Sequence, residues 1–430
     1  MKRILYLIAI LILFPVFSLS AIDVGVMSDQ TISVNSFGSD SDALKNGFLY
    51  SVTLTPWFSM PVNMSSGWNG KFYFSGALTA EYSHDPNKGN KVWSFIPELA
   101  RTEIMFRSSG GLEINIGRIF YSDPLGFVLS GFFDGARVSL DYGKAGIFGA
   151  GVWYTGLLYK TTAEITMTDE DMDRYGLFID YTDFANTYFA PRRFLAALDW
   201  ENPEITEWLK AKIALIVQTD LTGNRSRYHS QYLAAKATAF FNNFIFNLGS
   251  CVELFQYFPD SNLADANGNP FPDEVKLGIA GELGVGWFLP TRIEDQLTLI
   301  FRLSSGNLEE GIIGAFVPIT TQYQGDIIEA KLSGLSAIQL DYTGRINKSF
   351  AFNLAGTYFI LSDLGTYSGY PGEKNGFLLG GEISGRVIWS PVSDLVVYFG
   401  GGAFLPSLGN ADPQKDALWK LELNVSLMVF

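Results

Sequence analysis

Residues 111–158 decide the fold, and they read GLEINIGRIFYSDPLGFVLSGFFDGARVSLDYGKAGIFGAGVWYTGLL. Apolar and polar side chains alternate in three runs, which are 112–121, 132–142 and 145–158. In the middle run, for example, Val138 and Leu140 alternate with Arg137 and Ser139. Successive residues of a strand point to opposite faces, so each run predicts a strand with one apolar and one polar face.

The same alternation recurs along the whole chain and predicts about 18 strands, most of them as long as the about 9–11 residues that cross a bilayer. The candidate strands are 23–35, 46–61, 70–83, 94–107, 111–121, 132–142, 145–158, 193–201, 209–221, 229–241, 244–258, 274–289, 295–305, 334–345, 348–361, 376–389, 393–405 and 415–430.

The connections between these strands alternate between short and long. The short ones are 108–110, 143–144, 201–207, 242–243, 290–294, 346–347 and 390–392. The longer ones include 84–93, 122–131, 159–192, 259–273, 306–333, 362–375 and 406–414. Outer-membrane barrels have tight periplasmic turns and long outer loops, so this alternation predicts a barrel with both termini on the periplasmic side. Gly143 and Lys144 alone would form one tight hairpin.

Composition supports the same class. Aromatic residues make up 15% of the chain, charged residues 17%, and there are 44 glycines. After the N-terminal segment no run of about 18 apolar residues occurs, which excludes a transmembrane helix. We therefore predict an all-β fold: a single transmembrane antiparallel β-barrel of about 18 strands in the outer-membrane bilayer.

The first 21 residues predict a secretory signal peptide. Lys2 and Arg3 precede an apolar run at 4–17, and small residues follow at 18–21. The barrel would then occupy residues 22–430.

Several other classes of protein are disfavoured. The net charge of -14 argues against nucleic acid, whose phosphates need basic patches. The single cysteine, Cys251, cannot form an internal disulfide. His229 and Ser230 are adjacent and would point to opposite faces of a strand, and His84 lies in a loop beside Asp85, so we expect no catalytic triad, no enzyme activity and no cofactor.

Aromatic residues gather near the predicted strand ends, where amphipathic rings favour the headgroup level of a membrane. They are Trp57, Phe58, Tyr82, Phe120, Tyr121, Tyr154, Trp200, Phe240, Phe241, Trp287, Phe288, Trp389 and Trp419. The chain ends on Phe430, as barrels delivered to the barrel assembly machinery do. Phe430 is out of phase with Leu427 and Val429, so we expect a bulge near the end of the last strand.

Two patches resemble the alginate-export family of outer-membrane barrels. One is Gly117-Arg118 followed by a loop and the FDGAR motif at 133–137, together with GAGVWYTG at 149–156. The other is YFGGGAFLP at 398–406. The resemblance implies an 18-stranded barrel that passes an anionic polysaccharide through an arginine-lined lumen.

Charged residues are expected to face the lumen, because a charge on the lipid face costs about 2–4 kcal/mol at mid-depth. Acidic and basic residues balance on that face, whereas an anion-selective lumen should be net positive. Guanidinium groups bind carboxylates bidentately, so arginines are the best candidates for selectivity. The candidate lumen and selectivity residues are Arg101, Arg107, Arg137, Asp141, Arg302 and Arg386. Arg137 and Asp141 lie on either side of Ser139 and could border a constriction, although most inward charges could equally be structural ion pairs.

Two loops have compositions that bear on function. The longest, 159–192, combines acidic and aromatic residues, so it either folds inward as a plug or forms a solvated surface loop. The segment 265–269 reads DANGN, but its glycine is at the fourth position and not at the sixth that a Ca²⁺ loop needs, so we expect a turn and no metal site.

These features predict a channel, or porin, in the outer membrane that passes hydrophilic solutes, among them saccharides or carboxylates. Two alternatives remain open. One is a transporter of hydrophobic molecules with a lateral exit, which would show a kinked strand and an interior apolar pocket. The other is a closed barrel that displays its loops as an adhesin.

Overall fold

The computed structural model describes residues 22–36, 47–63, 67–85, 90–223, 226–260, 272–307, 312–364, 376–411 and 416–430. The predicted signal peptide and the 265–269 turn lie outside these residues. No helix in the described segments is both long enough and apolar enough to span a membrane.

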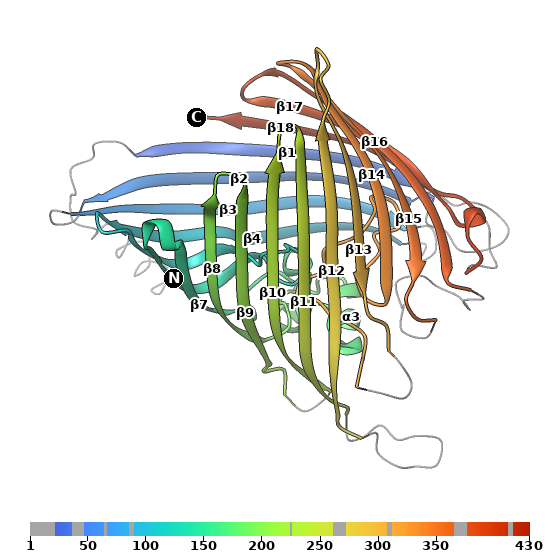
Figure 1. Cartoon of the computed structure of the whole chain (residues 1–430), viewed down its shortest axis with the longest axis horizontal. Coiled ribbons are helices and arrows are strands. Elements are labelled where there is room, and N and C mark those ends of the chain that lie inside the picture. The colour runs from blue at the N-terminus through green and yellow to red at the C-terminus, as the bar shows by residue number, and fades with distance from the viewer. Residues whose placement is uncertain are drawn as a thin grey trace.

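Eighteen strands form one antiparallel sheet that closes on itself, because β1 pairs with both β2 and β18 (Figure 1). They are β1 (Asp23–Asn35), β2 (Gly47–Asn63), β3 (Trp68–Asp85), β4 (Asn90–Ser108), β5 (Leu112–Ser122), β6 (Ser130–Asp141), β7 (Ile147–Tyr154), β8 (Arg193–Thr206), β9 (Leu209–Asp220), β10 (Arg227–Phe241), β11 (Phe244–Phe258), β12 (Glu274–Phe288), β13 (Glu294–Ser304), β14 (Leu335–Asn347), β15 (Phe350–Leu361), β16 (Leu378–Val392), β17 (Leu395–Leu405) and β18 (Leu418–Val429). The predicted barrel and its strand number are confirmed. Closure leaves no free sheet edge along most of the wall, as a membrane requires.

Alternation along each strand separates an apolar outer face from the lumen. Leu198 of β8 and Leu248 of β11 are exposed on the outside, at 59% and 63% of their surface. Ala197, the neighbour of Leu198, is buried on the inner side. Exposed leucines on the outer surface of a closed barrel are positions for lipid contact.

Two sequence expectations about strand ends are wrong in detail. The β6–β7 connection is not a two-residue hairpin, since it contains a 3-10 turn (Gly143–Ala145) and β7 begins only at Ile147. No bulge precedes Phe430, because β18 pairs with β1 in one unbroken register up to Val429. The Phe430 ring instead packs edge-on against Trp57, with centroids 6.0 Å apart.

Some of the aromatic residues assigned to the membrane interface point inward, among them Trp57 and Tyr121. Trp57 stacks on Tyr73 with ring centroids 6.1 Å apart, and both line a cavity that also contains Lys71. Tyr121 is buried and packs 4.6 Å from the Trp153 ring inside the barrel. A ring near a strand end can therefore face either side, and only its phase with its neighbours decides.

The long β7–β8 connection is a folded unit with three short helices, α2 (Lys160–Ala163), α3 (Asp169–Gly176) and α4 (Phe184–Thr187). Figure 1 shows α3 within the outline of the barrel. The β7–β8 connection also buries apolar side chains, among them Ala163, Ile165 and Met167. Of the two alternatives for this loop, inward folding is the one observed.

Candidate functional site

Three loops enter the barrel and narrow its lumen. We call them the inward loops: 123–129, 155–192 and 312–334. Two backbone hydrogen bonds tie the third loop to the first and second, from Ile319 N–H to Val128 O at 2.8 Å and from Thr321 N–H to Glu164 O at 2.9 Å. The loops therefore act as one connected constriction.

Asp123 shapes the first inward loop. Its two carboxylate oxygens accept hydrogen bonds from the N–H groups of Leu125, Gly126, Val128 and Leu129, at 2.7–3.1 Å. Burial raises the pKa of Asp123, although these four donors oppose that rise. One side chain thus satisfies a backbone turn that enters a region without solvent.

Arg193 anchors the second inward loop to the wall. It begins β8, is fully buried, and its guanidinium lies 2.6 Å from the Asp171 carboxylate of α3. The same guanidinium contacts Asp220 at the end of β9. Thr168 and Asp171 form a reciprocal cap at the start of α3, which fixes the helix that carries the carboxylate.

Two buried glutamates hold the third inward loop against two separate places on the barrel wall. Glu253 of β11 accepts a hydrogen bond from Val317 N–H at 2.8 Å and another from the Tyr228 hydroxyl at 2.8 Å. Glu382 of β16 accepts from Asp326 N–H at 2.6 Å and from the next two backbone N–H groups. The loop is therefore attached to the barrel wall at both β11 and β16.

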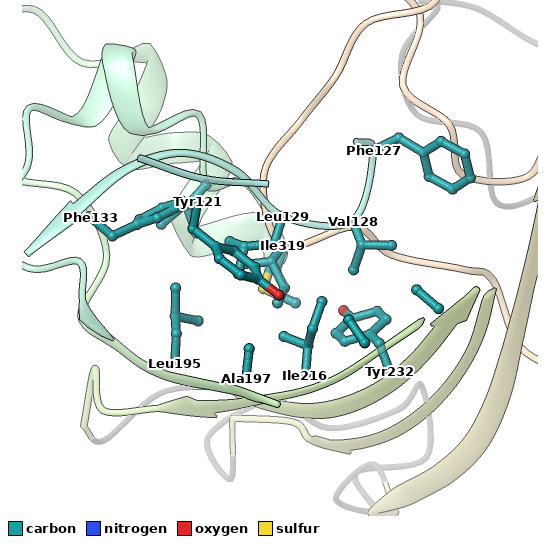
Figure 2. Close-up of a cluster of buried hydrophobic side chains, with 14 of the residues drawn as sticks. Tyr121, Phe127, Val128, Leu129, Phe133, Leu195, Ala197, Ile216, Tyr232 and Ile319 are labelled. Carbon is teal, nitrogen blue, oxygen red and sulfur yellow. The ribbon is translucent and has the colours of Figure 1, made fainter. Parts of the chain in front are cut away.

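Apolar packing completes the attachment (Figure 2). Val128, Leu129 and Ile319 of the inward loops face Leu195, Ile216 and other inward side chains of β8 to β11. Gly249 of β11 belongs to this contact, because a Cβ atom there would collide with Leu125. The lumen is therefore filled beside β8 to β11, and its open half lies against β13 to β18.

The open half contains two polar cavities. The larger, of about 800 Å³, lies against β13 to β16, and the smaller, of about 410 Å³, lies against β16 to β18. Asp326, Tyr323 and Arg386 line both. The other charged residues around them are Glu164, Glu294, Arg302, Glu329, Asp341, Arg345, Glu382, Lys420 and Glu422.

Two of the predicted selectivity residues, Arg302 and Arg386, line the larger cavity. Arg386 is partly exposed and lies 3.3 Å from Asp326. Arg302 is more enclosed, and it donates to Glu282 and to Gln324, each at 2.8 Å.

The other four lie elsewhere on the wall. Arg101 contacts Glu103 through Nε at 2.7 Å, and Arg107 contacts Glu113 through Nε at 2.9 Å. Arg137 lies 2.6 Å from Asp199 of β8, and not beside Asp141. The Asp141 carboxylate accepts the Gly143 N–H at 2.7 Å and so belongs to the β6–β7 turn. Each of the five arginines is therefore paired with a carboxylate.

Sequence reasoning missed the charged residues that the loops contribute, chiefly Glu164, Asp326 and Glu329. Burial and the nearby Glu329 carboxylate raise the pKa of Glu164 to about 7. Lys420 of β18 reaches the Glu329 carboxylate at 3.1 Å. No local pattern marks these positions, because loop residues have no strand phase from which to infer an inward direction.

A closed 18-stranded antiparallel barrel with an apolar outer face and a loop-narrowed polar lumen is the fold of outer-membrane porins. The chain therefore has a β-barrel fold of this porin-like class.

Comparison with solved structures supports that class. A BenF-like porin from Pseudomonas fluorescens Pf-5 matches with a TM-score of 0.59 at 9% identity, over 95% of this chain and 98% of the other. OccK5 (OpdH) of Pseudomonas aeruginosa matches with a TM-score of 0.56 at 11% identity, over 95% and 98%. OccAB4 of Acinetobacter baumannii matches with a TM-score of 0.57 at 10% identity, over 95% and 98%. At these identities the likeness concerns the fold.

No family model matches the chain, and no curated protein matches it. The resemblance to the alginate-export family is therefore not shown, and the porin-like architecture is what stands.

Proposed function

We propose that the protein is a channel that passes small hydrophilic solutes along the barrel axis, with carboxylates and saccharides as the solute classes. The observation behind this proposal is a cavity of about 800 Å³ inside the barrel. Polar residues line it both from the third inward loop and from β13 to β16. Polar groups of both signs can replace part of the hydration shell of a small solute during passage.

Arg386 is the group best placed to contact a carboxylate solute. Its side chain is 37% exposed, and its contact with Asp326 at 3.3 Å is long for a charge-assisted hydrogen bond. Arg302, by contrast, already donates to two protein acceptors. A solute carboxylate can therefore compete for Arg386 at less cost than for Arg302.

Small solutes fit this lumen better than an anionic polymer does. The alginate-export resemblance implies an arginine-lined lumen, whereas all five predicted arginines have a carboxylate partner. We also propose that the chain is not an enzyme and that residues 22–430 form the mature barrel. We further propose that the barrel assembly machinery recognises Phe430. The adhesin alternative stays a prediction without a supporting contact.

Liposome swelling with the refolded protein tests the proposal. We expect rapid swelling in isosmotic arabinose and in sodium succinate, and much slower swelling in a tetrasaccharide. Equal rates for all three solutes would contradict a narrowed lumen. No swelling in any of them, from protein that runs as a folded barrel on an unheated gel, would contradict a channel.

A further inference from the structure

The barrel wall is incomplete between β4 and β5. β4 pairs with β3 along its whole length, from Asn90 to Ser108. It pairs with β5 only from Thr102 to Arg107. The rest of β4 therefore has a strand on one side only. A free strand edge presents unpaired N–H and C=O groups, which a bilayer does not tolerate.

Side chains, and not a strand, satisfy this edge. The Tyr181 hydroxyl donates to Phe95 O at 2.7 Å and accepts from Phe95 N–H at 3.0 Å. The Tyr188 hydroxyl donates to Pro97 O at 2.5 Å. Pro97 has no N–H to satisfy, as is usual for proline on an edge strand. The second inward loop thus closes the wall through a few side-chain contacts, which we call the seam.

The base of the seam is closed by Arg118. Its guanidinium donates to both carboxylate oxygens of Asp134, at 2.8 and 2.7 Å, to Leu157 O at 3.1 Å, and to Leu99 O. Arg118 is in phase with Ile116 and Phe120, which are exposed on the outer face. A charge at that position is costly in lipid, and here it is buried and makes four hydrogen bonds.

The seam lies within the apolar band of the barrel. On β3 and β4, Tyr82 and Trp93 form an outward ring pair with centroids 5.0 Å apart, as expected at the outer interface. Phe72 and Phe58 form a second outward pair, 5.6 Å apart, nearer the periplasmic turns. Phe95 lies between these two levels, just inside the outer pair. The seam therefore faces the outer leaflet.

The two sides of the seam differ in chemistry. Outside, Phe95, Leu99 and Leu157 are exposed, at 58%, 40% and 56%. Inside, the Glu98 carboxylate accepts a hydrogen bond from the Thr162 hydroxyl at 3.0 Å. An apolar outer surface beside a polar inner acceptor matches a small amphipathic molecule with a hydrogen-bond donor in its head.

We propose that the seam is a lateral opening through which small amphipathic molecules dissolved in the outer leaflet reach the lumen. Segment 177–188 is the part that moves, since α3 before it is fixed by Arg193. Separation of Tyr181 and Tyr188 from β4 opens the route, and the donor head of the molecule replaces Thr162 at Glu98. This route is distinct from axial passage of hydrophilic solutes, and either one can fail without the other.

A cysteine at position 96 reports on the opening. Ile96 lies on the inner side of β4 at the seam and is 6% exposed. Native Cys251 is buried on β11, which is paired with β10 on one side and β12 on the other, and it serves as the internal reference. The Ile96→Cys protein in phosphatidylcholine vesicles is treated either with pyrene maleimide, which partitions into the membrane, or with a sulfonated maleimide that stays in water. Peptide mapping gives the labelling rate at each cysteine.

With native tyrosines, we expect pyrene maleimide to label position 96 faster than Cys251. Tyr181→Phe with Tyr188→Phe should raise the pyrene rate at position 96 by about ten-fold, because hydrogen bonds across the seam are lost. Tyr358→Phe is the control: it removes a 2.9 Å hydrogen bond from the Tyr358 hydroxyl to Leu408 O, which lies away from the seam. This variant should leave the pyrene labelling rate at position 96 unchanged. The sulfonated reagent should react equally with all variants.

Equal acceleration of both reagents would overturn the proposal, because it would mean that the loop had loosened into the aqueous pore. Equal pyrene labelling of position 96 and Cys251 with native tyrosines would also overturn it, and that comparison needs no variant at the seam itself. Swelling in hydrophilic solutes is measured on the same vesicles, so that a failure of the seam is distinguished from a failure of the axial channel.

Discussion

The guanidinium of Arg193 lies 2.6 Å from the carboxylate of Asp171, and both side chains are buried between the wall of the barrel and its longest loop. Asp220, also buried, contacts the same guanidinium. These two ion pairs fix the second inward loop in the lumen. A buried ion pair of this kind is costly to break from one side.

Arg193→Ala should therefore release the second inward loop. The change leaves two buried carboxylates without their cation, a loss of about 3–5 kcal/mol in comparable buried pairs. We expect a larger and noisier single-channel conductance, because the loop no longer stays packed in the lumen. Arg227→Ala, at an exposed arginine that stacks on Phe258, is the matched control and should leave the current unchanged. A quiet, native current from Arg193→Ala would show that the ion pair does not hold the loop.

Glu253→Ala should release the third inward loop from the β11 wall. Val317 N–H and the Tyr228 hydroxyl both lose their acceptor, and a buried donor without a partner costs about 1–3 kcal/mol. We expect faster cleavage within 312–334 when a protease is added to vesicles. Glu294→Ala removes an exposed carboxylate 3.7 Å from Arg345 and should not change cleavage. If both variants resist the protease alike, Glu253 is not an anchor.

Ion selectivity should depend on pH through Glu164. Its pKa is raised to about 7 by burial and by Glu329, so the carboxyl is mostly neutral at pH 6 and mostly ionised at pH 8. We expect the reversal potential in a KCl gradient to move toward cation preference as the pH rises across that interval. Glu164→Gln should remove most of this step.

The raised pKa of Glu164 also determines how the stability of the barrel changes with pH. The folded state holds the Glu164 proton more tightly than the unfolded chain does, so stability falls as pH rises from the ordinary value of 4.5 to about 7 and is level above it. A Glu164→Gln barrel should lose that decline. If the change of selectivity with pH persists unchanged in Glu164→Gln, then another titrating group causes it.

Selectivity should respond to arginines according to their place in the lumen. Arg386→Ala and Arg137→Ala each leave a carboxylate unopposed, Asp326 and Asp199 respectively, so both should shift the reversal potential toward cations. Only Arg386→Ala should also weaken block of the current by added succinate, because only Arg386 is a proposed solute contact. Arg386→Lys should retain the sign of the charge while losing bidentate binding. Equal succinate block in Arg386→Ala and the parent would remove Arg386 from the solute path.

Alternation of side chains was sufficient to predict the wall of the barrel. In β9 and β11, for example, the observed bounds fall within a residue of those expected, because each strand has a lipid face that tolerates almost no charge. The short turn between Phe241 and Phe244 follows from the same phase. Contact with lipid requires this alternation within each strand, so a short stretch of sequence is enough to predict it.

The inner loops and the seam could not be predicted in this way. Burial of Val128 or Ile319 depends on contacts with residues far away in sequence, for which no local periodicity exists. At the seam the register of β3 and β4 shifts between Ser75 and Gly76, which leaves Ala100 unpaired and exchanges the inward and outward phases of β4. Two charged residues in the outward phase of their predicted strands, Glu98 and Arg118, were the sequence signals of that irregularity.

Single-channel recording in planar bilayers tests the central claim most directly, by comparison of the parent with a variant in which 162–190 is replaced by a short glycine-serine linker. We expect discrete ohmic steps from the parent and distinctly larger steps from the variant, because the second inward loop occupies the lumen. Steps of the same size from both proteins, or none from a parent that migrates as a folded barrel, would contradict it.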